Sequence, residues 1–132
     1  MTTMREFGSA QTTDRLEDAA KAIRKAAAAP EEDAVHKMRV AIRRLQQSLR
    51  LFEQFFRTKG VKQVRRDLKA IMTTAGEVRN FDIAISLGAK RASFRKPLQE
   101  RRHQAQNEFL AVLGGVGASE LPDRWKSKLE LS

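Results

Sequence analysis

The sequence predicts an all-α fold, an antiparallel bundle of about four main helices followed by a short C-terminal helix. Apolar residues recur three and four positions apart over long stretches, which is the spacing of the buried face of an α-helix. No stretch alternates apolar and polar residues with a period of two, and the 132-residue chain contains no tyrosine. Its glycines and prolines fall where helices would begin or end. We therefore expect no strand.

The first expected helix begins near residue 14. Asp14 and Glu17 have the spacing of a capping box, and small apolar residues follow at helical spacing until Pro30. The preceding residues are small and polar with little to bury, so we expect residues 1–12 to be disordered. Residues 13–132 would then form a single helical domain, because a chain of this length holds one core.

The second expected helix runs from Pro30 to about Arg57. A proline suits the first turn of a helix, and the three acidic residues that follow it complement the helix dipole. The apolar face of this helix is long and regular, and it consists of Val35, Met38, Ile42, Leu45, Leu49, Phe52 and Phe56. Gly60 is the expected stop.

The same reasoning places the remaining helices. A third helix begins near Val61 and repeats the apolar alternation, and Gly88 marks the turn after it. Pro97 is expected to open a fourth helix, Leu98–Leu113, which the glycine-rich segment after it terminates. A short helix around Trp125 then caps the bundle.

Composition limits the classes of function. The chain has no cysteine, which excludes disulfides, thiolate chemistry and cysteine-ligated zinc. No uncharged apolar stretch approaches the roughly 20 residues of a membrane span, and the N-terminus lacks an apolar run of signal-peptide length, so we expect a cytoplasmic protein. No metal-ligand cluster, carboxylate pair, phosphate loop or nucleophile triad can be assembled. We therefore expect no catalytic residue, no metal and no other cofactor.

The unusual feature is charge. Lysine and arginine total 26 against 16 acidic residues, which gives a formal net charge of +10 and favours a polyanionic partner. Residues 35–69 carry eleven basic and two acidic residues, whereas the rest of the chain is nearly balanced. Solvated faces normally mix both signs, yet residues 37–50 contain no acidic residue. Arginine outnumbers lysine there, and its planar fork suits bidentate phosphate recognition.

These basic residues also share helix faces. At about 100° per residue, one arc of roughly 60° on the second helix carries His36, Arg39, Arg43, Arg50 and Arg57. One flank of the third helix carries Lys62, Arg65 and Lys69. Arg79 points close to the apolar face of the third helix and needs a partner there. Either Asp82 at i+3 pairs with it, or Arg79 reaches past the apolar face into an anion site.

Two motifs carry a family resemblance. They are His36-x-x-Arg39-Val40-x-x-Arg43-Arg44-Leu45 and, some thirty residues later, Gly76-Glu77-Val78-Arg79-x-x-Asp82-Ile83. Together they resemble the CHAD domain, a helical histidine-containing module that binds inorganic polyphosphate. Family members carry Arg-Asp-x-Asp where this chain has Arg79-Asn80-Phe81-Asp82. CHAD domains are usually about twice this size, with two related halves around a shared basic channel. The resemblance covers about residues 14–113 and only the first half.

The resemblance implies a function and a set of residues. It implies a non-catalytic protein whose partner is inorganic polyphosphate, held in a basic groove between the second and third helices. The implied lining residues are His36, Arg39, Arg43, Arg44, Arg50, Lys62, Arg65, Lys69 and Arg79. It also implies a missing half of the architecture, which a two-fold homodimer would supply.

Two other functions use the same charges. A sequence-independent RNA- or DNA-binding protein would need the same basic face, although single-strand binders usually add aromatic platforms, and no Tyr, Trp or Phe lies on the cationic arc. A phosphohydrolase or phospho-acceptor would use His36 as its reactive group.

Overall fold

All regular structure in the protein is helical. The computed structural model describes residues 1–88 and 91–131, the side chain of Ala92 excepted. The elements are α1 (Met4–Ala28), α2 (Glu32–Phe52), α3 (Thr58–Leu87), α4 (Ala92–Gly115) and α5 (Asp123–Leu129), with short 3-10 turns at Glu53–Phe55 and Ala118–Glu120. No strand occurs in these described ranges, so the all-α prediction is confirmed.

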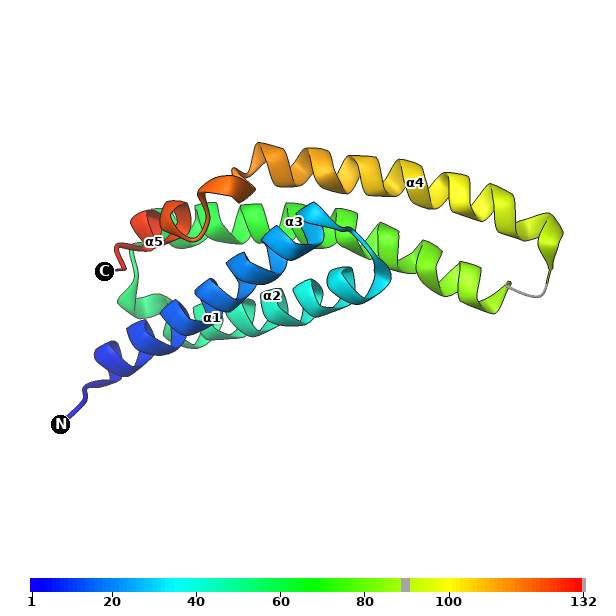
Figure 1. The fold of residues 1–132 in the computed structure, drawn as a ribbon. Coiled ribbons are helices and arrows are strands. Elements are labelled where there is room, and N and C mark those ends of the chain that lie inside the picture. The colour runs from blue at the N-terminus through cyan, green and yellow to red at the C-terminus, as the bar shows by residue number, and fades with distance from the viewer. Residues whose placement is uncertain (89–90, 132) are drawn as a thin grey trace.

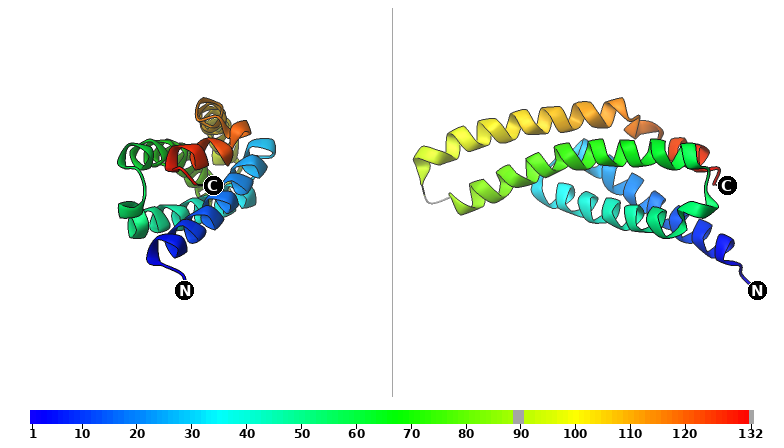
Figure 2. Two further views of the ribbon diagram at one scale, coloured as in Figure 1. Left: turned by 90° about the vertical axis from the view of Figure 1, so that its left-hand side faces the viewer. Right: turned by 180° about the vertical axis from the view of Figure 1, so that it is seen from behind.

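Two antiparallel helical hairpins build the fold (Figure 1). Helices α1 and α2 form one hairpin, α3 and α4 form the other, and α2 packs against α3. The α3–α4 hairpin extends well beyond the α1–α2 hairpin at the end away from the termini, as both side views show (Figures 1 and 2). The short α5 packs against α3 and α1. None of the described helices is long and apolar enough to cross a membrane.

The core forms where the two hairpins meet. The predicted apolar face of the second helix is buried throughout, from Val35 to Phe56. The apolar face of α3 is likewise buried, from Val61 to Val78. Phe109 of α4 and Trp125 of α5 are the largest fully buried side chains. The three–four spacing therefore identified the inner faces of both central helices.

The N-terminal segment differs from the prediction. The first twelve residues were expected to be disordered, and this is wrong, because α1 begins at Met4. Gly8 lies against Phe52 so closely that a Cβ on it would be 2.7 Å from a ring carbon. The hydroxyls of Thr12 and Ser48 share a buried hydrogen bond of 2.8 Å. The segment is ordered by contacts with α2, which its own small and polar composition does not reveal.

Three helix boundaries also differ. Helix α2 ends at Phe52 rather than near Arg57, and a 3-10 turn follows it. Gly60 lies in the first turn of α3 instead of stopping a helix. A Cβ there would come within 1.9 Å of the carbonyl oxygen of Lys128, so close packing of α5 requires this glycine. Pro97 is inside α4, which begins at Ala92.

Candidate functional site

The predicted binding residues lie on two antiparallel helices that pack against each other (Figure 2). We call this set the cationic strip: His36, Arg39, Arg43, Arg44 and Arg50 on α2, and Lys62, Arg65, Lys69 and Arg79 on α3. Seven of the nine are exposed, and only Arg39 and Arg79 are partly buried. The regular faces of the two helices therefore turn apolar residues into the core and most of the cations toward solvent.

Arg39 lies at the centre of a cluster of three arginines. Its Nε atom is buried and has no hydrogen-bond partner in the described part of the chain. Burial lowers the pKa of Arg39, and the nearby positive charges of Arg43 and Arg79 lower it further. A partly desolvated cation with like charges beside it and no acceptor raises the free energy of the folded state. This is the kind of position that an anion would relieve.

Most of the strip has no partner of its own. Among residues 1–88 and 91–131, no hydrogen bond or ion pair is made by the side chains of His36, Arg39, Arg43, Arg44, Arg50, Lys62 and Lys69. Arg44 stands apart from the others, because it projects about 100° around α2 from Arg43. The structure therefore brings Arg39, Arg43 and Arg79 together and leaves Arg44 at the edge of the strip.

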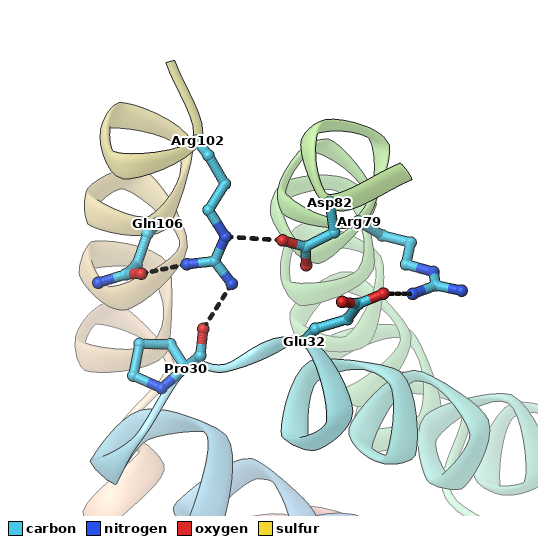
Figure 3. Close-up of polar contacts among 6 residues, drawn as sticks. All are labelled: Pro30, Glu32, Arg79, Asp82, Arg102 and Gln106. Carbon is cyan, nitrogen blue, oxygen red and sulfur yellow. Dashed lines mark hydrogen bonds and ion pairs between the residues drawn. The ribbon is translucent and has the colours of Figure 1, made fainter. Parts of the chain in front are cut away.

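Two members of the strip do have carboxylate partners. Nη1 of Arg79 lies 3.0 Å from Oε1 of Glu32, and Nη2 of Arg65 lies 2.7 Å from Oε2 of Glu53. Asp82, the partner considered for Arg79 from the i+3 spacing, turns away from it and toward α4 (Figure 3). Arg79 instead pairs with Glu32 of α2, so the considered pairing with Asp82 is wrong, and the reach of Arg79 into an anion site stays a prediction. Its acceptor Glu32 was not foreseen.

Asp82 belongs to a separate buried junction. Nε of Arg102 on α4 donates to Oδ1 of Asp82 at 2.8 Å, and its Nη2 donates to the carbonyl oxygen of Pro30 at 2.8 Å (Figure 3). Its Nη1 donates to the side-chain oxygen of Gln106. Arg102 thus joins α3, α4 and the connection between α1 and α2. Sequence reasoning missed Arg102, and the available signal was Asp82 on a mostly apolar helix face.

The strip is an open surface. Five pockets on the described part of the chain lie elsewhere, among them one between α1 and α2 and another beside Asp82 and Arg102, and none of these five is lined by a strip residue. The described residues also contain no group of three or more His, Asp or Glu side chains that could hold a metal ion.

Comparison with protein families gives one match. A model of the CHAD domain matches residues 10–132. This chain belongs to the CHAD-domain family. The match confirms the resemblance carried by the two motifs. It covers residues 10–132 of this chain, a longer stretch than residues 14–113. Some members of this family bind polyphosphate. Searches of curated proteins and of solved structures return no significant match.

Proposed function

We propose that this CHAD protein binds inorganic polyphosphate on the cationic strip and does not convert it chemically. The observation that carries the proposal is the arginine cluster around Arg39, whose buried Nε has no acceptor and whose neighbours Arg43 and Arg79 are also positive. A phosphate beside this cluster would offset the repulsion among the three guanidinium groups. Membership of a family in which some proteins bind polyphosphate supports the same ligand.

The exposed members of the strip give the ligand room to extend. Arg39 and Arg50 are separated by eleven residues, which corresponds to roughly 16 Å along α2. Successive phosphates of a linear chain would meet successive guanidinium and ammonium groups over this length. Charge-assisted hydrogen bonds are stronger than neutral ones, and each neutralised phosphate releases condensed counterions. We therefore expect affinity to fall steeply as salt concentration rises.

The test is a binding titration with labelled long-chain polyphosphate across a salt series. The double variant Arg39→Glu/Arg43→Glu reverses two charges at the centre of the strip and is expected to lose at least about 100-fold in affinity, with a shallower salt slope. The matched control is Lys21→Glu/Lys25→Glu, which makes the same charge change on exposed residues of α1. Equal losses in the two variants would show that only net charge matters.

The same titration addresses the two rival functions. Single-stranded RNA added at equal phosphate concentration is expected to displace little polyphosphate, because the strip carries no Tyr, Trp or Phe on which bases could stack. Displacement as effective as that by unlabelled polyphosphate would rank nucleic-acid binding first. His36 is exposed and has no partner among the described side chains. Release of phosphate, or a labelled histidine that disappears in His36→Ala, would support the phosphohydrolase or phospho-acceptor function.

We also propose that the protein forms a homodimer. The outer end of the α3–α4 hairpin, which stands clear of α1 and α2 (Figure 1), exposes Ile83, Leu87 and Phe94 at 43%, 84% and 52%. Apolar side chains grouped in this way are typical of association surfaces. The α3–α4 hairpins of two copies could pack as a four-helix bundle that buries these apolar side chains. The dimer would then supply the two related halves of a usual CHAD domain.

Light scattering at micromolar concentration tests the dimer. The wild-type protein is expected to have twice the mass of one chain, and Leu87→Lys is expected to be monomeric. Leu51→Lys is the matched control, because Leu51 is 72% exposed but lies on α2. A monomeric wild-type protein that binds long polyphosphate tightly would overturn the dimer proposal and leave the binding proposal intact.

A further inference from the structure

The two carboxylates that touch the cationic strip lie at the two ends of α2. Glu32 is the first residue of the helix and pairs with Arg79, and Glu53 follows its last residue and pairs with Arg65. Between these ends, residues 37–50 contain no acidic side chain. The protein therefore neutralises the ends of the strip and leaves its middle without a counter-ion.

We infer that Glu32 is an internal counter-ion that competes with the ligand for Arg79. The inference rests on the proposed polyphosphate binding and concerns how selective that binding is. Arg79 is close enough to Arg39 to lower the pKa of its guanidinium, so an anion that neutralises Arg39 also lies near Arg79. Its negative charge repels the Glu32 carboxylate. The carboxylate occupies Nη1 of Arg79, so a phosphate can use that donor only when Glu32 leaves it.

The solvent exposures of Glu32 and Arg79 favour replacement of the Glu32 carboxylate by a ligand phosphate. The Glu32 side chain is 60% exposed and the Arg79 side chain only 27%. The more exposed carboxylate can rotate into water, while the less exposed guanidinium has less freedom to move (Figure 3 shows the pair). Once displaced, Glu32 still lies in the first turn of α2, where the helix dipole favours a negative charge. Breaking the Glu32–Arg79 ion pair therefore costs little free energy.

The exchange would make the site selective for polyanions. A single phosphate offers one charged group, which must compete with a carboxylate already in place. A linear polyphosphate is anchored by the unpaired arginines next to Arg79, so its adjacent phosphate meets Arg79 at a high effective concentration. Glu32 thereby discriminates against small anions while costing a long chain little affinity.

The experiment compares Glu32→Gln with Glu31→Gln. Both variants remove one carboxylate at the start of α2, and Glu31 is exposed and forms no side-chain cap. In titrations with long-chain polyphosphate, we expect Glu32→Gln to bind about three- to fivefold more tightly than Glu31→Gln, the size of an exposed ion pair. The salt slope should also steepen by up to about one, because one more cation meets the ligand. With orthophosphate as the probe, Glu32→Gln should show a larger relative gain.

A double-mutant cycle isolates the pair. If Glu32 acts through Arg79, the gain disappears when Glu32→Gln is made in an Arg79→Gln background. A gain that persists there, or an affinity of Glu32→Gln equal to or below that of Glu31→Gln, overturns the inference. The second result would mean that Glu32 positions Arg79 for the ligand. Absence of polyphosphate binding by the wild-type protein would instead refute the proposed function.

Discussion

Arg39 on α2 and Arg102 on α4 are both partly buried, but their surroundings are opposite. Arg102 donates hydrogen bonds to a carboxylate, a backbone carbonyl and an amide oxygen, all supplied by the protein (Figure 3). Arg39 has a buried Nε without an acceptor and two further arginines nearby. A buried guanidinium whose partners come from three segments holds those segments together. One without partners is stabilised only by something outside the chain.

The first prediction tests whether Arg102 stabilises the fold, and it has the largest expected change in stability. Arg102→Met would leave Asp82, which is 8% exposed, as a buried carboxylate without a cation. We expect a loss of about 3 kcal/mol in the free energy of unfolding, measured by urea denaturation followed by circular dichroism. Arg101→Met is the control, because Arg101 is an exposed neighbour on the same helix and its replacement should change stability by less than about 0.5 kcal/mol. Equal losses of stability in the two variants would show that the hydrogen bonds of Arg102 do not hold the helices together.

The second prediction tests whether stability and binding belong to different faces of α3. Gly60, Gln63 and Asp67 meet α5 through close backbone packing and two hydrogen bonds. At about 100° per residue they lie roughly opposite the strip residues of α3. Gly60→Ala forces α5 away and should cost about 2 kcal/mol, without changing the polyphosphate affinity of the folded protein.

Gly76→Ala provides the matched control for that variant. Gly76 is also helical, but a Cβ there meets nothing within 4 Å. Alanine at this position should stabilise α3 by about 0.5–1 kcal/mol, because glycine loses more backbone entropy in a helix. Thermal denaturation measures both variants. A fall in affinity for Gly60→Ala under conditions where it is folded would show that the two faces are coupled.

The smallest expected effect on stability concerns Arg39 itself. Arg39→Met removes a cation that has no acceptor and two like-charged neighbours, so stability should stay the same or rise by up to about 1 kcal/mol. Polyphosphate affinity should fall about tenfold, the value of one charge-assisted hydrogen bond. Urea denaturation and the binding titration measure the two quantities on the same sample. Destabilisation as large as that of Arg102→Met would remove the distinction between the two arginines.

Periodicity predicted the parts of this protein that depend on neighbours along the chain. The apolar faces of both central helices were correct from Val35 to Val78, because each helix must bury one continuous side. The order of residues 1–12 was missed, since it depends on Phe52 and Ser48 of α2. Gly60 was misread as a stop, because the close approach of Lys128 that it permits is formed by residues far along the chain.

For the candidate site too, sequence spacing predicted some features and helix packing determined others. The gathering of cations on α2 and α3 was predictable from the sequence, because helical spacing sets which residues share a face. Which of these cations have partners depends on how the helices pack together. Among the described residues, Arg79 pairs with Glu32 rather than Asp82, Asp82 pairs with Arg102, and Nε of Arg39 has no acceptor. The physical reason is that ion pairs form between whichever side chains packing brings within a few ångströms, and packing joins residues that sequence spacing does not relate.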